Sequence, residues 1–213
     1  MIQETIGFVK NELEGADSGH DWWHVLRVYN LARHIAEEEG ADRFIVEMAA
    51  LLHDVGDPKL HDGDETVAPR LIGGWLDELG LEKDKKDHIM HIIENMSFSK
   101  HLDGKKVEKS TEFKVVQDAD RIDGIGAIGI ARTFAYGGHK GREIYNPDKQ
   151  FKEGLTKEEY RKANDPTINH FYEKLLKLKE LMNTKTGKKI AEGRHEFMEL
   201  FLKQFYDEWE GRA

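Results

Sequence analysis

The sequence predicts an all-α protein. Apolar residues recur at helical spacing in several separate segments, and no segment shows the sustained apolar-polar alternation that is typical of a strand. The chain has 213 residues, of which 38% are hydrophobic, so it can bury one sizeable core, and no stretch has the composition of a linker. We therefore expect a single domain over residues 1–213, built as a helical bundle.

The first strongly periodic helix begins near Trp23 and ends before Gly40, which is a typical C-terminal stop. Its apolar residues fall at helical spacing: Val25, Val28, Tyr29, Ala32, Ile35 and Ala36. Asp42 is a suitable N-cap for the next helix. That helix is apolar on nearly all sides up to Leu52, as expected at the centre of a bundle. The pair His53-Asp54 ends it.

A loop and two further helices are predicted next. Gly56 and Pro58 interrupt the chain, and a polar loop at 61–65 follows. The periodicity then indicates helices at about 67–79 and 83–96.

The second half of the chain combines helices with an irregular insert. Residues 115–134 are apolar and rich in small side chains, so we expect a buried, tightly packed helical segment there. Residues 136 to about 164 form a Gly-rich and then Lys-rich insert, and inserts of this length are usually functional or mobile. Helical periodicity returns at 171–182 and 190–209, which we expect to pack on the domain as C-terminal helices spanning about 168–209.

Composition excludes several classes of function. The formal net charge of −9 disfavours stable nucleic-acid binding, and an anionic substrate needs local cations or a metal ion. The absence of cysteine excludes disulfides, thiolate metal sites and a cysteine nucleophile. No segment reaches the ~18 apolar residues of a membrane span, and the N-terminus does not have the pattern of a signal peptide. We expect a cytoplasmic protein with no membrane partner.

An imidazole next to a carboxylate at the end of an apolar helix indicates a metal site. His53 and Asp54 form this pair, and His24 lies on the preceding amphipathic helix. Imidazole nitrogens and carboxylate oxygens suit Mn²⁺, Fe²⁺, Zn²⁺, Ni²⁺, Co²⁺ or Mg²⁺, and two His with two Asp ligands leave positions for water and a phosphate oxygen. The ion lowers the pKa of its water and offsets phosphate charge. The pattern favours a metalloenzyme that cleaves phosphate bonds.

Three aspartates are candidates for the last ligand. Each helical residue advances ~100°, so Asp120 and Asp123 share a face while Asp118 points roughly 200° away from Asp120. One face of the helix therefore carries at most two of these candidates, Asp120 and Asp123. Taken alone, His24, the His53-Asp54 pair and Asp120 are each better explained as polar residues at a helix end or as ion-pair partners. Together, in the order H…HD…D, they favour a metal site.

Four segments of the chain resemble the small bacterial and archaeal HD-domain hydrolases of the YpgQ type, and the resemblance covers about residues 19–205. The segments are GHDWWHVLRV (19–28), ALLHDVGDPK (50–59), QDADRIDGIGAIGIAR (117–132) and INHFYEKLL (168–176). The resemblance implies an all-helical HD fold. It selects Asp120 as the last ligand beside His24, His53 and Asp54, with Asp123 as a supporting residue. Gly124 departs from the family's usual aliphatic or Ala residue, which should affect packing more than chemistry.

The resemblance also implies the activity. It predicts a divalent-metal-dependent phosphohydrolase, most similar to enzymes that cleave a (deoxy)nucleoside triphosphate into a monophosphate and pyrophosphate by attack of a metal-bound water. We expect one divalent ion per chain. His88 and His91 do not form a convincing motif for a second ion. The TKTGKK run at 184–189 lacks the first glycine and the preceding strand of a phosphate loop, so we reject it.

The remaining site residues are predictions from chemistry. Arg27 and Lys59 are placed to bind phosphate oxygens. Asp54 is expected to act in catalysis as well as in metal binding, and Asp57 or Glu65 is expected to orient the attacking water as general base.

Further substrate contacts are predicted from the aromatic first motif and the insert. The motif that opens with His20 offers a ring to stack on a nucleobase. Asp123 is also predicted to lie near the bound substrate. Lys140 and Arg142 are candidates to close over a triphosphate, and His170 to face the same cleft.

Three alternatives share these residues. A 5′-nucleotidase or a phosphodiesterase uses the same metal-bound water on a different phosphate. A nucleotide-sensing HD protein binds without turnover. The expected partner is in each case a small-molecule nucleotide, and the apolar C-terminal face around 201–205 leaves a homodimer possible.

Overall fold

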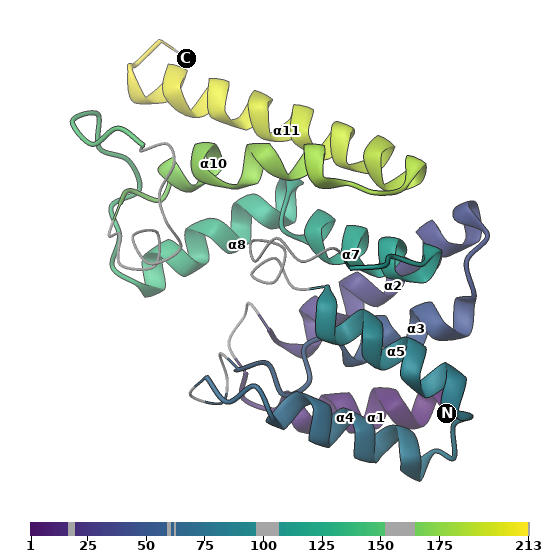
Figure 1. The fold of residues 1–213 in the computed structure, drawn as a ribbon. Helices are drawn as coiled ribbons and strands as arrows, with labels where there is room; N and C mark the ends of the chain where they lie inside the picture. The colour runs from purple at the N-terminus through teal and green to yellow at the C-terminus, as the bar shows by residue number, and fades with distance from the viewer. Residues whose placement is uncertain (17–19, 59–60, 62, 97–106, 152–164, 213) are drawn as a thin grey trace. The chain divides into compact units, whose positions relative to one another are not determined.

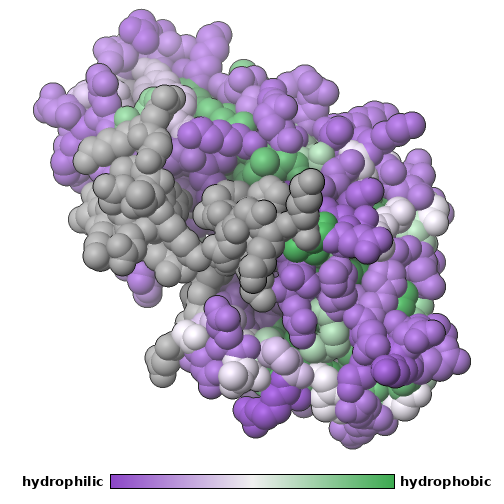
Figure 2. Space-filling view, viewed as in Figure 1, coloured by the Kyte–Doolittle hydropathy of each residue, from purple (hydrophilic) through white to green (hydrophobic). Residues whose placement is uncertain are grey.

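A computed structural model describes residues 1–16, 20–58, 61, 63–96, 107–151 and 165–212, and it contains helices and no strand within these ranges (Figure 1). The predicted all-α class is confirmed. The chain divides into two compact units, Met1–Asp120 with Asn183–Gly187, and Arg121–Met182 with Lys188–Ala213. The face drawn in Figure 2 is mostly hydrophilic, which agrees with the 34% of charged residues in the sequence.

The first unit is built around a central buried helix. The helices are α1 (Ile2–Glu12), α2 (Trp22–Glu39), α3 (Arg43–Leu52), α4 (Val67–Glu78), α5 (Lys83–Asn95) and the larger part of α7 (Thr111–Asp123). Helix α3 packs against α1, α2 and α5, and α4 packs against α5. All residues of α3 from Ile45 to Leu52 are buried, as its almost entirely apolar sequence predicts, and the buried range includes the charged Glu47.

Local capping sets the ends of α2 and α3. The Asp42 carboxylate accepts hydrogen bonds from the backbone N–H groups of Phe44 (2.9 Å) and Ile45 (3.2 Å), so the predicted N-cap is confirmed. Gly40 adopts a φ of 67° and ends α2. At the start of α2, Asp21 accepts from the backbone N–H of His24 at 2.8 Å. This cap holds His24 in the first turn of its helix.

Helix α1 has no counterpart in the sequence prediction. Only Thr5 and Val9 are buried along its length, so its apolar signal is weak. Tertiary contacts hold it: the Phe8 ring stacks on Trp75 of α4 with centroids 4.5 Å apart, and the Trp75 indole N–H donates to Thr5 Oγ1 at 3.0 Å.

The second unit holds α8 (Gly126–His139), α10 (Asn169–Glu173), a 3₁₀ helix (Leu175–Leu181) and most of α11 (Lys185–Trp209). Phe134 of α8, Phe171 of α10 and Phe201 of α11 form a three-ring core with centroids 5.8–6.1 Å apart. The predicted C-terminal helical segments are therefore confirmed, although α11 begins five residues before the predicted Ile190.

The prediction of one helical segment over 115–134 was wrong at a single place. Helix α7 ends at Asp123, α8 begins at Gly126, and Gly126 adopts a φ of 76°. The expected close packing of small residues is present after the break, because a Cβ at Gly129 would lie 2.3 Å from the Gly124 carbonyl oxygen. The glycines thus serve the turn between two helices as well as the packing. The insert predicted from Tyr136 begins later than expected, because α8 continues to His139, and its part at 152–164 lies outside the described residues.

Candidate metal centre

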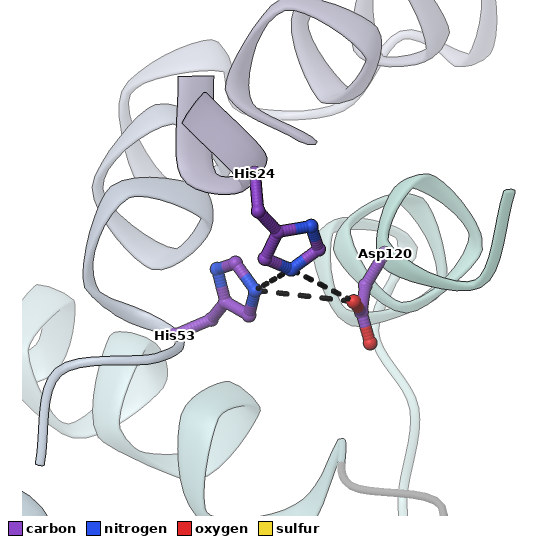
Figure 3. A group of neighbouring side chains, drawn as sticks. All are labelled: His24, His53 and Asp120. Atoms are coloured by element: carbon purple, nitrogen blue, oxygen red, sulfur yellow. Dashed lines mark hydrogen bonds and ion pairs between the residues drawn. The ribbon is translucent and has the colours of Figure 1, made fainter. Parts of the chain in front are cut away.

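Three helices of the first unit bring a cluster of metal-binding side chains together. His24 lies in the first turn of α2, His53 directly follows α3, and Asp120 lies on α7 (Figure 3). His24 Nε2 is 3.2 Å from His53 Nε2 and 3.5 Å from Asp120 Oδ1, and His53 Nε2 is 3.9 Å from Asp120 Oδ1. The two imidazole rings and the carboxylate therefore converge on one small volume.

Asp54 extends the cluster to the four predicted residues. Its Oδ2 atom lies 3.5 Å from His24 Nε2, and its Oδ1 atom lies 3.6 Å from His53 Nε2. The Asp54 side chain is 9% exposed, whereas the Asp120 side chain is 36% exposed. The cluster is thus buried on the Asp54 side and open to solvent beside Asp120, where a substrate can approach.

The spacing of the donor atoms fits a divalent ion. Ligand atoms bound at about 2.1 Å lie about 3.0 Å apart along an octahedral edge and about 3.4 Å apart along a tetrahedral edge. The distances of 3.2–3.9 Å among the four side chains lie on either side of the tetrahedral edge and all exceed the octahedral one, so small shortening movements would bring the donors onto one ion.

The protonation of His53 also suits metal binding. Its Nδ1 lies 2.8 Å from the Ala50 carbonyl oxygen, which can only accept, so Nδ1 carries the proton. In the neutral imidazole, which is the form that binds a metal ion, Nε2 then presents its lone pair toward His24 and Asp120. A backbone carbonyl that fixes the tautomer in this way is the usual support of a metal-binding histidine.

Both carboxylates are ionised at neutral pH. Burial opposes the charged form of Asp54, but the charge of His53 and the hydrogen bond and charge of His20 outweigh it, so its pKa lies well below 3.8. Burial also opposes ionisation of Asp120, and its hydrogen bond to His24 with the charges of His53 and His24 again hold the pKa below 3.8. Two ionised carboxylates beside two imidazoles form a donor set that suits a divalent cation once the imidazoles are neutral.

A tight turn after α3 positions Asp57, the next of the predicted site residues. Val55 N–H donates to the Leu52 carbonyl at 3.1 Å, and Asp57 N–H donates to the Asp54 carbonyl at 3.2 Å. Gly56 takes a φ of 70° in this turn, and a Cβ there would lie 2.7 Å from Ala68 Cα. The turn brings the Asp57 carboxylate to a second group with His20 and Asp54, whose donor atoms lie within 4.8 Å of one another.

The other predicted site residues of the first part of the chain have different positions relative to the cluster. His20 lies at the cluster, with Nδ1 2.9 Å from Asp54 Oδ2, so it contacts a ligand candidate. Arg27 is half-buried on α2, one turn beyond His24. Glu65 is exposed in the loop before α4. Lys59 lies outside the described residues.

Four predicted residues lie in the second unit. Asp123 is buried and its Oδ2 forms an ion pair with Arg132 Nη1 at 2.6 Å. Lys140 Nζ and the Arg142 guanidinium each lie 5.6 Å from the centre of the Tyr136 ring. Burial, followed by the charges of Lys174 and Arg142, lowers the pKa of His170 to about 3. His170 is therefore neutral at physiological pH.

Asp118, the weaker ligand alternative, has a structural role. It is fully buried, and its carboxylate accepts from the backbone N–H and side-chain amide of Asn183 and from the backbone N–H and hydroxyl of Thr184 at 2.7–3.1 Å. These contacts hold the residues before α11, where the rejected phosphate-loop pattern begins. The opposite face of α7 from Asp120 is thus used for packing, as the 100° rule predicts.

The two other histidines considered for a second ion have different partners. His88 Nε2 lies 2.8 Å from Ser110 Oγ, and His91 Nε2 lies 2.9 Å from the Glu108 carbonyl oxygen. The sequence analysis missed the contact of His20 with Asp54. His20 precedes the N-cap Asp21 and lies outside α2, so no helical spacing points to this contact with a residue 34 positions away.

Comparison with known proteins defines the class. Residues 22–125 match the model of the HD domain family. The chain belongs to this family and is an HD-superfamily hydrolase.

Among its relatives, the uncharacterized protein YpgQ of Bacillus subtilis is 42% identical over 197 residues, which cover 92% of this chain and 88% of YpgQ. The crystal structure of an HD-superfamily hydrolase from Bacillus thuringiensis shares 49% identity, with a TM-score of 0.78 over 98% of this chain and 96% of the other. The crystal structure of Bacillus subtilis YpgQ in complex with ADP shares 38% identity, with a TM-score of 0.77 over the whole of both chains. In the described parts of this chain, every helix is too short or too polar to cross a membrane.

Proposed function

We propose that this protein is a divalent-metal-dependent phosphohydrolase that converts a (deoxy)nucleoside triphosphate into a monophosphate and pyrophosphate. The observation that carries the proposal is the four-residue cluster of His24, His53, Asp54 and Asp120, buried on one side and open on the other. A crystal structure of the relative YpgQ contains ADP, which supports a nucleotide as the ligand class.

Individual residues of this chain would have distinct roles in metal binding, catalysis and substrate binding. His24, His53, Asp54 and Asp120 would hold one divalent ion, which lowers the pKa of a water and offsets charge on a phosphate oxygen. Asp57 would stand beside this group, while the exposed Glu65 is the weaker choice for a role in catalysis. Arg27, one turn from His24, would bind phosphate oxygens.

The reaction itself needs no covalent intermediate with the protein. Water attacks the α-phosphorus, the bond between this phosphorus and the bridging oxygen breaks, and pyrophosphate leaves with that oxygen. The water proton passes to a base of the site or to solvent. The strongly negative chain would repel a triphosphate without a cation at the site, so binding and chemistry both depend on the metal.

Product analysis tests the proposal. Metal-stripped protein is incubated with ribo- and deoxynucleoside triphosphates and Mn²⁺, Mg²⁺, Co²⁺, Ni²⁺ or Zn²⁺, and the products are separated by chromatography. We expect monophosphate and pyrophosphate from the wild type, a loss of at least about 100-fold in Asp54→Asn, and no loss in the matched control Asp87→Asn, which removes an exposed charge on α5.

Other products would replace the proposal with one of its alternatives. Release of inorganic phosphate from monophosphates indicates a 5′-nucleotidase, and cleavage of diesters indicates a phosphodiesterase. Nucleotide that is retained without any product identifies a sensor. Equal activity in wild type and Asp54→Asn contradicts the metal cluster as the site.

A further inference from the structure

His20 reaches the metal cluster from the same capped segment as His24. It directly precedes Asp21, whose carboxylate accepts from the backbone N–H of His24 at 2.8 Å and whose carbonyl oxygen accepts from the backbone N–H of Val25 at 3.2 Å. These two hydrogen bonds fix the start of α2. The rings of His20 and His24 therefore enter the site from one short piece of ordered backbone, with centroids 6.5 Å apart.

The closest contact of His20 within the cluster is with one oxygen of Asp54. Its Nδ1 atom lies 2.9 Å from Asp54 Oδ2, whereas the imidazoles of His24 and His53 lie 3.5 and 3.6 Å from this carboxylate. The ionised carboxylate can only accept, so Nδ1 carries the proton and donates it. The two side chains are 20% and 9% exposed, so this charge-assisted hydrogen bond is largely shielded from water.

This hydrogen bond limits how the Asp54 carboxylate can turn. An aspartate side chain has two torsions, and the second is broad, so the carboxylate rotates easily unless a partner holds it. With Oδ2 held by His20, Oδ1 lies 3.6 Å from His53 Nε2, and Oδ2 itself stays 3.5 Å from His24 Nε2. Carboxylates that bind metal ions are commonly held by such a hydrogen bond. The Ala50 carbonyl supports His53 in the same way.

From these contacts we propose that His20 is a positioning residue for the metal site. It donates a hydrogen bond from Nδ1 to Asp54 Oδ2 and holds this carboxylate in the orientation that binds the divalent ion. The inference rests on the metal site of the proposed function. It gives His20 a role distinct from the nucleobase stacking predicted from the sequence, and the two roles have different effects on metal affinity.

Metal titration tests the proposal without substrate. The full chain is stripped with a chelator, and its affinity for Mn²⁺ is measured by isothermal titration calorimetry. We expect His20→Ala to bind Mn²⁺ about 10–100-fold more weakly than the wild type, the usual effect of removing the partner of a metal ligand. His20→Asn should recover most of the affinity, because its amide nitrogen lies as many bonds from the backbone as Nδ1 and also donates. His20→Gln, whose amide nitrogen reaches the position of Nε2 instead, should bind as weakly as His20→Ala.

A matched control separates this effect from a general loss of structure. His34→Asn removes an exposed imidazole from the same helix and should bind Mn²⁺ like the wild type. Far-ultraviolet circular dichroism shows that each variant is folded before titration. A contribution of His20 to stability alone would not change the dissociation constant, because the constant is measured on folded protein.

Each other outcome has a distinct meaning. Equal Mn²⁺ affinity in wild type and His20→Ala overturns the positioning role and leaves the proposed function intact. The same result together with a raised KM for nucleoside triphosphates assigns His20 to substrate binding instead. His20→Asn that binds as weakly as His20→Ala overturns the Nδ1 hydrogen bond as the cause. A wild type that binds no Mn²⁺ contradicts the metal site and the proposed function together.

Discussion

Asp118 and Asp120 are two residues apart on α7 and have different surroundings. Asp120 is partly exposed beside two imidazoles, whereas Asp118 is fully buried and accepts hydrogen bonds from Asn183 and Thr184. A buried carboxylate with this many partners contributes to folding, and its removal leaves the partner N–H groups without acceptors. The same residue type therefore serves stability at one position and is proposed to serve chemistry at the other.

Replacing these two aspartates should separate the two roles. We expect Asp118→Ala to lower the free energy of unfolding by about 3 kcal/mol, from the loss of several buried hydrogen bonds, with metal content unchanged. Asp120→Ala should lower metal content with a much smaller loss of stability in the absence of metal. Urea unfolding of the metal-free proteins and metal analysis of the loaded proteins measure both. Reversed results would make Asp118 the ligand.

His170 predicts how stability depends on pH in acid. Burial, then Lys174 and Arg142, lower its pKa in the folded protein from 6.5 to about 3. Below pH 6.5 the unfolded chain binds a proton at this residue that the folded chain does not, so the unfolded state is stabilised relative to the folded state as the pH falls toward 3. The contribution is absent above about pH 6.5. Since His170 is half-buried, we expect a cost of about 1–2 kcal/mol at pH 5.

The variant His170→Gln isolates this contribution, because glutamine does not titrate. Urea unfolding at pH 7.5 and pH 5 should show a smaller loss of stability in the variant by about 1–2 kcal/mol. His34→Gln, at an exposed position, should behave like the wild type. An identical pH dependence in wild type and His170→Gln would show that His170 protonates freely in the folded state.

At the scale of elements, the turn between α3 and α4 determines the geometry of the centre. His53, Asp54 and Asp57 all lie on this turn, and Gly56 allows it because its φ is 70° and Ala68 of α4 occupies the space of a side chain. A residue with a Cβ must move the turn away from α4. The donors on either side of Gly56 would move with it.

We expect Gly56→Ala to lower Mn²⁺ affinity by about 10-fold or more, because supporting residues of metal sites commonly have effects of this size. Gly80→Ala is a matched control: Gly80 has a φ of 66°, but a Cβ there meets no atom within 4 Å. It should cost about 1 kcal/mol of stability from backbone strain and leave metal affinity unchanged. Isothermal titration calorimetry measures the affinities. Equal affinities in both variants would show that the turn tolerates displacement.

The sequence predicted elements whose signals are local. Asp42 and Gly40 are sufficient to place the boundary between α2 and α3, since a cap acts on its own neighbours. The order of His24, His53, Asp54 and Asp120 likewise predicted a cluster of side chains that the structure brings together.

Features that depend on distant partners were not predicted. Asp118 finds its partners 65 and 66 residues further along the chain, and His20 finds Asp54 34 residues away, so neither contact has a local pattern. The break between α7 and α8 lies among glycines that are compatible with both a packed helix and a turn. Only the φ of 76° at Gly126 distinguishes the two.

At the scale of the whole molecule, the prediction of a single domain can be tested by its cooperativity. The chain passes between the two compact units after Asp120 inside α7, after Met182, and after Gly187 inside α11. Two of the three passages run through a continuous helix, so neither of them contains a linker at which one unit could unfold separately. We expect one calorimetric transition, with equal van't Hoff and calorimetric enthalpies. Two resolved transitions would show that the units are separate domains.

Metal binding should stabilise the whole chain, because the donors come from α2, the turn after α3, and α7, and converge only in the folded state. An ion at about 100 times its dissociation constant adds about 2.7 kcal/mol. For a chain of this length, that raises the melting temperature by about 5–10 °C. Differential scanning calorimetry with Mn²⁺ or chelator should show this shift in wild type and in Asp87→Asn, and little of it in Asp54→Asn. An equal shift in Asp54→Asn would mean that the stabilising ion binds elsewhere, because Asp54 belongs to the proposed ligand cluster.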